Sequence, residues 1–543
     1  MQKSYAWQAA ALMLAMIVIW GGAPLVKGAY YLGKHEGDTL HMAEIVVRMA
    51  RGEWPHLDFM TPIGVLAAAP IMWFVKIGAG LGHAFFYAQI LVALVLAPAV
   101  LRVVNSRIAG MAGLGYAFFV MVLCLALVHG EAEPAVSISM HYNRWAWAIA
   151  YIVVPLVMLA PREGQASATL DGVIIGLGMA ALLLIKATYF AALAPGILTG
   201  LLVRRWWGAL GAAALAGLVV AGVVTALAGM GFWLAYLGDM LTVAGSDVRP
   251  QPGAPLAGVA GAPAYMGASL TILAAVIFLR QAGRMTEGLL LLVLMPGFYY
   301  IVFQNFGNDP QWLLMLALFA FVLRPAAGMV NSLGWDLRQG LTICAVLAVA
   351  FGFPSAMNLA YSPFRHLFAT EEKMVPLLSG LPQHQDILTG ASRIYGVLEL
   401  RQGDGPGSPY EDFREISQRE DKPVLLNGEA LAYCEQQSGP IASFEEMARD
   451  LEAAGYAGKR LLVADLISGL WLYGDFEPVR GAAPWYYGGL SGVENADYVV
   501  IPLCPTSAKV RGGMITSLEE GGYSLHEERR TRTYILIKAE KAG

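Results

Sequence analysis

The chain has 543 residues, of which 57% are apolar and only 14% are charged, well below the roughly 25% charge that is usual in a soluble domain. A protein core cannot hold so many apolar side chains, so the composition excludes a wholly water-soluble protein and requires a bilayer as a second apolar solvent. The formal net charge of −4 provides no basic surface and argues against nucleic acid as a partner. The four cysteines are too few for a disulfide scaffold and lack the spacing of metal ligands.

The membrane-spanning part begins with an apolar run at 7–26. Its roughly 20 residues can cross a hydrocarbon layer of about 30 Å. Because no small-residue cleavage site follows before Lys27, we expect a retained span rather than a secretory signal. Further apolar runs long enough to span, or nearly so, lie at 62–81, 84–104, 109–128, 145–160, 168–185, 189–203, 206–229, 266–280, 286–303, 311–324 and 339–356.

Basic residues divide the connections between these runs into two alternating sets. Cytoplasmic connections are rich in Lys and Arg, so we expect the basic set inside and the C-terminal domain outside. Twelve complete crossings would leave that domain inside, so one segment between 62 and 104 must not cross fully, or a crossing is missed. The basic set contains Arg102 with Arg107, Arg162, Arg204 with Arg205, Arg280 with Arg284, and Arg324 with Arg338. The other set comprises 129–144, the turn near Lys186, 230–265 and 304–310.

The composition turns polar after the last apolar run, and short apolar stretches alternate there with helical patterns. Apolar stretches of this length are typical of buried strands. We therefore predict a membrane all-α bundle of about 11–13 spans at 1–356, followed by an extracytoplasmic α/β domain at 357–543. The expected strands lie at 424–426, 460–464 and 498–503, the helices at 443–454 and 509–520, and a closing hairpin at 523–539.

The cysteines fall into two pairs. Cys124 and Cys344 lie in apolar helices, where we expect buried and inert thiols. Cys434 and Cys504 share the C-terminal domain and could pair in an oxidising compartment. The demanding geometry of a disulfide nevertheless favours two free thiols.

The first outer loop, at 27–61, carries much of the charge of the bundle. Residues 39–51 suit a short amphipathic helix, with Asp38 at its N-cap position. The Asp38 carboxylate would then either accept backbone N–H bonds or serve in chemistry, and both interpretations remain open. The apolar face would contain Leu40, Ala43, Val47 and Ala50, and the polar face Glu44, Arg48 and Arg51.

After Asp38 and this helix comes the run Gly52-Glu53-Trp54-Pro55-His56-Leu57-Asp58-Phe59, which leads into the second span. This arrangement resembles the GT-C superfamily of polytopic glycosyltransferases. Its members use polyprenyl-phosphate sugars and include protein O-mannosyltransferases, aminoarabinose lipid A transferases and the catalytic subunit of oligosaccharyltransferase. Members often have Asp-Glu at the first acidic site, whereas this chain has Glu36-Gly37-Asp38, which leaves open which carboxylate does the chemistry.

A glycosyl phosphate already contains a good leaving group. An enzyme therefore needs a carboxylate to deprotonate the acceptor hydroxyl, cations to neutralise the departing phosphate, and a site that excludes water. A base at the outer membrane surface can meet a lipid-borne donor without drawing the sugar into hydrocarbon. We interpret Asp38 as that base.

Members of the superfamily often have a second acidic motif in a comparable outer loop, where it helps to hold a divalent metal or the acceptor. Glu131 and Glu133 match it here, and carboxylates two residues apart can converge on one oxygen-preferring cation. With His141 they are the candidate ligands of Mg²⁺ or Mn²⁺. Solvated loop charge is the alternative.

Three basic residues are candidates for binding the donor phosphate. Arg144 could bind phosphate as a planar fork or anchor the chain at lipid headgroups. Lys186 interrupts an apolar stretch, and an ionisable residue there is either functional or reaches out to the interface. Arg249 lies in a long loop that could close over the donor or could be only a connector.

Two further polar regions could take part in recognition. The turn that contains Asn308 and Asp309 could bind sugar or phosphate, or Asp309 could cap the next helix; Asp58, in the first loop, is a further substrate-binding candidate. In the C-terminal domain, aromatic residues could stack on carbohydrate, sit at the membrane interface or pack the domain on the bundle. They are Trp471, Tyr473, Trp485, Tyr486 and Tyr487, with Gly488 and Gly489 beside them.

The favoured hypothesis is an inverting membrane glycosyltransferase. It would move a hexosyl or pentosyl group from a polyprenyl-phosphate donor to a lipid, glycan or protein outside the cytoplasmic membrane. The alternatives are a transporter or flippase of a lipid-linked saccharide, and a non-enzymatic scaffold or sensor. A transporter should line a path with intramembrane charge and have matching halves, and neither feature is evident. A scaffold would leave the charged first loop without a purpose.

Overall fold

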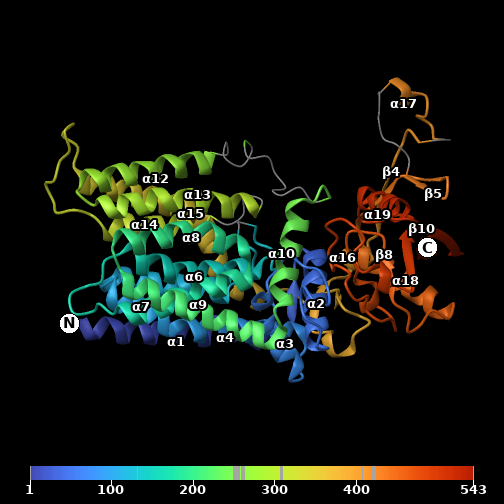
Figure 1. The fold of residues 1–543 in the computed structure, drawn as a ribbon, viewed down its shortest axis with the longest axis horizontal. Helices are drawn as coiled ribbons and strands as arrows, with labels where there is room; N and C mark the ends of the chain where they lie inside the picture. Colours follow the sequence, from blue (N-terminus) through green and yellow to red (C-terminus); the bar gives the residue numbers. More distant parts are fainter. Residues whose placement is uncertain are drawn as a thin grey trace.

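The computed structural model describes residues 2–130, 133–248, 263–305, 310–405, 408–416 and 424–541, together with Ala257. A bundle of long helices lies at one end of the molecule and a mixed domain at the other (Figure 1). This order of elements confirms the predicted fold class, a membrane-type helical bundle followed by a C-terminal α/β domain.

Eleven helices of the described residues make up the bundle, and six of them are both long and apolar enough to cross a membrane. Lipid offers no hydrogen-bonding partners to the backbone, so a spanning segment must pair its own N–H and C=O groups, and an α-helix does so within itself. The bundle helices are α1 (Gln2–Lys27), α4 (Leu81–Ser106), α5 (Gly110–Leu125), α6 (His141–Met158), α7 (Ala168–Ile185), α8 (Ala187–Val203), α9 (Trp207–Ala228), α12 (Pro263–Gln281), α13 (Met285–Gln304), α14 (Trp312–Val322) and α15 (Leu337–Leu367).

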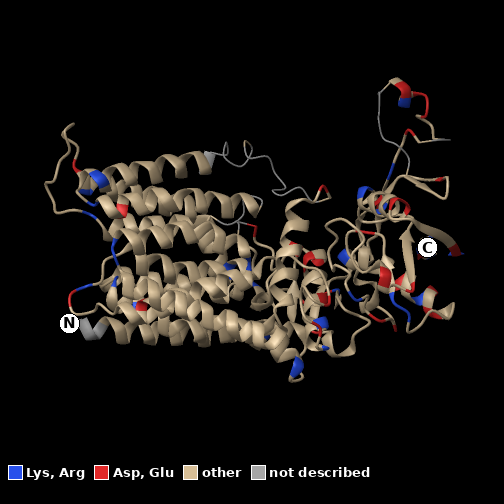
Figure 2. Ribbon diagram, in the orientation of Figure 1, with Lys and Arg blue, Asp and Glu red and all other residues tan. Residues whose placement is uncertain are grey.

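Of the two alternatives, a segment between 62 and 104 that does not cross or a missed crossing, the short helix α3 (Ala69–Lys76) agrees with the first. Eight residues extend only about 12 Å at 1.5 Å per residue, too little for a bilayer. With α3 excluded, the described bundle has an odd number of helices, so the C-terminal domain lies opposite the N-terminus. Figure 2 shows the basic connections gathered at the N-terminal end, away from that domain.

The last bundle helix is longer than predicted. We expected it to end at residue 356, but α15 continues to Leu367. The apolar run stops at residue 356, whereas the helix continues with polar residues such as Asn358, which donates a hydrogen bond to the Glu133 carbonyl. The boundary at 356/357 therefore falls inside a helix.

The C-terminal domain has a four-stranded sheet in the order β10-β11-β9-β8, in which β8 and β9 are parallel and the other pairs antiparallel. The predicted strands, helices and hairpin are all present, although β5 pairs with β6 outside this sheet. The elements are β5 (Val424–Leu426), β6 (Glu429–Leu431), α18 (Pro440–Ala453), β8 (Leu461–Val463), β9 (Tyr498–Pro502), α19 (Ala508–Glu520), β10 (Tyr523–Arg530) and β11 (Tyr534–Lys541).

The first outer loop is tied to the C-terminal part of the chain by a strand that the sequence did not reveal. Strand β1 (Tyr30–Leu32) lies parallel to β3 (Ile387–Gly390), which also pairs with β2 (Met374–Pro376). The remaining elements are α2 (Glu36–Ala50), α10 (Gly231–Ala244), α16 (Ala391–Tyr395), β4 (Leu398–Arg401), α17 (Phe413–Ile416) and β7 (Cys434–Ser438), with short 3-10 turns at Val65–Ala67, Pro382–His384, Gly469–Leu472 and Val493–Asn495.

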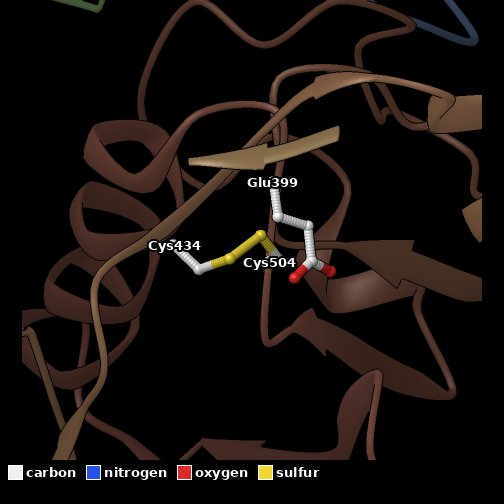
Figure 3. Close-up of side chains that lie close together, drawn as sticks. All are labelled: Glu399, Cys434 and Cys504. Atoms are coloured by element: carbon white, nitrogen blue, oxygen red, sulfur yellow. A yellow bond between two sulfur atoms is a disulfide. The ribbon is translucent and has the colours of Figure 1, made fainter. Parts of the chain in front are cut away.

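Cys434 and Cys504 form a disulfide (Figure 3), so the expectation of two free thiols was wrong. The bond joins β7 to the segment just after β9, two segments that lie 70 residues apart and belong to different sheets. Cys124 and Cys344 are free and buried, as predicted.

Candidate active site

The candidate base lies on α2, between the bundle and the C-terminal domain (Figure 1). The helix begins at Glu36, three residues earlier than predicted, and its N-cap is His35, with φ of 69°. Asp38 therefore does not cap the helix but lies in its first turn. The capping alternative for this carboxylate is excluded.

The Asp38 carboxylate is half-buried and faces the loop before α6. The Ser139 hydroxyl donates a hydrogen bond to Asp38 Oδ2 at 2.9 Å. Ser137 accepts a bond from the Ser139 amide at 3.0 Å and also contacts His35 Nδ1 at 3.0 Å. The start of α2 is thus held against residues 137–139.

Two histidines pack beside this carboxylate without adding positive charge. The rings of His35 and His129 lie 4.9 Å apart. Burial, together with the neighbouring His35 and Arg144, lowers the pKa of His129 to about 4, and burial also lowers the pKa of His35. Both imidazoles are therefore neutral at pH 7, so the positive charge near Asp38 must come from Arg and Lys.

Arg144 lies in the first turn of α6 and is only 1% exposed. Its guanidinium donates to the carbonyl of Val128. This burial excludes an anchor at lipid headgroups. A cation held in a low-dielectric interior interacts strongly with an anion that enters the same site.

Lys186 occupies the break between α7 and α8, where its extended backbone interrupts the helix. Its ammonium donates to Asn305 Oδ1 at 2.6 Å and to Asn143 Oδ1 at 3.3 Å. Both asparagines are fully buried, so Lys186 points into protein and does not reach out to the lipid interface. Asn143 precedes Arg144 in the chain, so Lys186 and Arg144 both lie near the start of α6.

Asn143 and Asn305 belong to this site but were not singled out in the sequence. Each lies next to a residue that was, in the segments His141–Arg144 and Gln304–Trp312. The signal that could have revealed them is a pair of amides at the ends of apolar helices, where burial demands a hydrogen-bonding partner.

The extension of α15 adds another group of residues that sequence reasoning missed. Asn358 donates to the Glu133 carbonyl at 2.8 Å, and Ser355 donates to the Gly130 carbonyl. Arg365 in turn donates to Asn358 Oδ1 at 2.8 Å. Ser355 and Asn358 lie three positions apart, which places them on one face of the helix, and they hold the loop that carries the second acidic motif.

The candidate metal ligands do not converge. His141 is buried, and its Nε2 lies 2.9 Å from the Ala67 carbonyl, whereas the Glu133 carboxylate is paired with Lys34 at 3.0 Å. Glu131 lies outside the described residues. The described members of the set therefore do not fit a metal centre, and we derive no step through one.

Among the described residues, one group has three potential ligand atoms within 4.8 Å of one another, and it consists of Glu399, Cys434 and Cys504. Figure 3 shows that the two sulfur atoms of this group are bonded to each other. Thiolates are the form of cysteine that binds metal, so the oxidised pair offers no metal site.

The remaining predicted site residues lie elsewhere or outside the description. Asp58 pairs with Arg480 at 3.1 Å and accepts a bond from the Trp54 amide at 2.8 Å, so it fixes a turn and contacts the C-terminal domain. Arg249, Asn308 and Asp309 lie outside the described residues.

Two of the three residues of the predicted polar face of α2, Glu44 and Arg48, are buried against the C-terminal domain, whereas Arg51 is exposed. Arg48 is 1% exposed and donates to the carbonyls of Val479 and Ala482, at 3.0 and 3.4 Å. It also pairs with Glu53 at 2.7 Å and lies 3.6 Å from Glu44. The base is therefore carried on a helix that is fixed on both faces.

These features define a polytopic membrane protein with a polar site at the end of its bundle that bears the C-terminal domain. No family model and no curated protein matches the chain. Two crystal structures of ArnT from Cupriavidus metallidurans, the aminoarabinose lipid A transferase of the GT-C fold, align along nearly the whole chain. The apo structure has 13% identity, covers 98% of both chains and gives a TM-score of 0.35; the complex with undecaprenyl phosphate has 13% identity, covers 97% and gives 0.36. At these values the likeness carries no argument about activity.

Proposed function

We propose that this protein is a membrane glycosyltransferase that moves a sugar from a polyprenyl-phosphate donor to an extracytoplasmic lipid, glycan or protein. The observation that carries the proposal is that a carboxylate, a buried cation and a partly buried cation all lie at or contact residues 139–144. Asp38 contacts Ser139, Lys186 contacts Asn143, and Arg144 follows directly. Base and cations thus lie at the same end of the bundle.

In the proposed reaction, Asp38 accepts the proton of the acceptor hydroxyl as its oxygen attacks the anomeric carbon. The bond to the phosphate breaks on the opposite side, so the configuration inverts. Arg144 and Lys186 stabilise the negative charge on the departing polyprenyl phosphate.

Two observations support an extracytoplasmic site. The basic connections lie at the opposite end of the bundle (Figure 2), which is the cytoplasmic end under the positive-inside rule. The domain next to the site contains a disulfide, and disulfides persist in oxidising compartments outside the cytosol.

The charges within the described bundle helices give a transporter little support. Arg102 and Arg107 each pair with Asp171 at 2.7 Å, and Arg204 pairs with Glu287 at 2.9 Å. All of these residues lie near helix ends at the basic side, so they join helices there and do not mark a path across the bilayer.

Replacing Lys186 tests the proposed phosphate site. We expect Lys186→Met to weaken binding of undecaprenyl phosphate to the purified protein by about 10- to 150-fold, since hydrogen bonds to charged groups contribute roughly 1.5–3 kcal/mol. Lys186→Arg should retain most of the affinity, and Lys76→Met, a change at an exposed lysine of α3, should retain all of it. Equal affinity in Lys186→Met and the parent would contradict the assignment.

A further inference from the structure

A cavity lined by both polar and apolar residues lies between α10 and the C-terminal domain, apart from the candidate base. Its volume of about 270 Å³ corresponds to about nine waters at ≈30 Å³ each, enough for one sugar ring. Asp239 and Thr242 of α10 form one wall, and Met60 of the first outer loop lies beside them. The other walls come from the C-terminal domain, at 462–468 and 483–491.

Four hydroxyl groups that line this cavity donate their protons to backbone carbonyl groups of the protein. Thr242 donates to the Gly238 carbonyl at 3.0 Å, and Ser468 donates to the Ala483 carbonyl at 2.9 Å. Tyr486 donates to the Gly489 carbonyl at 2.9 Å, and Ser491 donates to the Gly481 carbonyl. Each of these four oxygens keeps lone pairs that can accept hydrogen bonds, so they favour a ligand that supplies donors.

The Asp239 carboxylate reinforces this preference for a ligand that donates hydrogen bonds. Asp239 Oδ2 lies 2.7 Å from His56 Nδ1 and accepts the Thr61 amide at 3.1 Å. Both contacts fall on one oxygen and fix the carboxylate, so Oδ1 can accept from a ligand. Asp465 also lines the cavity, but both of its oxygens already accept hydrogen bonds from Leu466 and from residues 506–507, so Asp239 is the carboxylate that is left for a ligand. The described lining contains no Lys, Arg or His, which disfavours an anion such as phosphate.

The aromatic cluster noted in the sequence supplies the apolar part of the wall. Tyr486 and Tyr487 line the cavity, followed by Gly488 and Gly489, whose φ values of 129° and 74° suit glycine. Aromatic rings beside hydrogen-bonding groups match a ligand with apolar and polar faces. A saccharide ring has both.

We infer that this cavity binds one saccharide unit of the acceptor substrate. The hydroxyl or amine groups of that saccharide donate hydrogen bonds to the oxygen atoms of the cavity wall. The inference rests on the proposed function for the role of that saccharide, but its binding can be measured separately. Ser468 lies 3.4 Å from Glu44, which follows Asp38 by six residues on α2, about 9 Å along the helix axis. The cavity therefore holds a unit remote from the reacting hydroxyl.

We would measure the binding of glucosamine to the full-length protein in nanodiscs by saturation-transfer NMR. Inorganic phosphate serves as the anionic comparison. We expect saturable transfer to glucosamine that phosphate does not compete away. Thr242→Phe, which fills the cavity from α10, should weaken binding at least tenfold. Leu241→Phe, one residue earlier on α10 and 64% exposed outside the cavity, should bind like the parent.

Ser491→Leu fills the cavity from the opposite wall and repeats the test if Thr242→Phe does not fold. Binding unchanged in the folded variants, or displaced by phosphate, would overturn the inference. Asp38→Asn should bind glucosamine normally while losing transfer, so full transfer by Asp38→Asn would instead overturn the proposed function. In a transfer assay, the cavity variants should raise the KM for the acceptor and leave kcat unchanged, because a remote contact contributes equally to the ground and transition states.

Discussion

Asp38→Asn is expected to lower kcat for sugar transfer by about 10²- to 10⁴-fold, which is the usual contribution of a general base. The amide has the same shape and can still accept the hydrogen bond from Ser139, but it cannot take a proton from the acceptor. Binding of the donor should be almost unchanged, since Arg144 and Lys186 remain. Transfer in membranes that contain equal amounts of each variant is the measurement.

Glu371→Gln is the matched control for this change. Glu371 lies on the same side of the bundle and pairs with Lys27 at 2.8 Å, but its side chain is 68% exposed. An exposed pair contributes little, so this variant should transfer like the parent. If Asp38→Asn transferred sugar as fast as the parent protein, Asp38 could not be the general base.

Arg48→Met is expected to reduce the free energy of unfolding by about 3–5 kcal/mol, the usual cost of removing one partner from a buried ion pair. Glu44 would remain buried without the nearby positive charge, and the Val479 and Ala482 carbonyls would lose their donor. Arg51→Met is the control, because Arg51 is 44% exposed and its contact with Glu477 spans 3.8 Å; we expect a change of at most about 1 kcal/mol. Chemical denaturation of the detergent-solubilised protein measures both.

The pH dependence gives a second check on the buried pair. Burial raises the pKa of Glu44, and the Arg48 charge opposes this rise. A carboxyl whose pKa is higher in the folded state binds more protons there than in the unfolded state, so stability falls as the pH rises from the ordinary carboxyl pKa to the raised one. Arg48→Met should steepen this fall, and Glu44→Gln in the same chain should remove it. Equal stability of Arg48→Met and Arg51→Met would contradict the account.

The bundle could be predicted because its physical signals are local in the sequence. Long apolar runs indicate helices, and the alternation of arginines across the connections indicated that a segment before residue 104 does not cross. The eight residues of α3 meet that requirement. The end of α15 could not be found from hydropathy, because its last turns leave the apolar region and continue through contacts with a distant loop.

The candidate site was only partly predictable, for the same reason. Lys186 was singled out because charge is costly within an apolar stretch, whereas Asp38 was chosen from the resemblance of the first loop to the GT-C superfamily. The burial of Arg48 depends on carbonyls more than 400 positions away, and the pairing of β1 with β3 also joins distant segments. No periodic pattern encodes such contacts. The disulfide was missed because it depends on the packing of β7 beside the segment after β9, and these segments are also distant in the sequence.

The central claim is that the start of α2 faces the compartment outside the cytoplasm, where a carboxylate can meet a membrane-tethered sugar phosphate. The most direct measurement is labelling of a single cysteine, Lys34→Cys, with a membrane-impermeant maleimide in intact cells. Lys34 is 46% exposed beside the candidate base, and Glu163→Cys, in the exposed connection between α6 and α7, reports on the opposite side. We predict that Lys34→Cys is labelled in intact cells and Glu163→Cys only after permeabilisation, whereas the reverse pattern would contradict the proposed site.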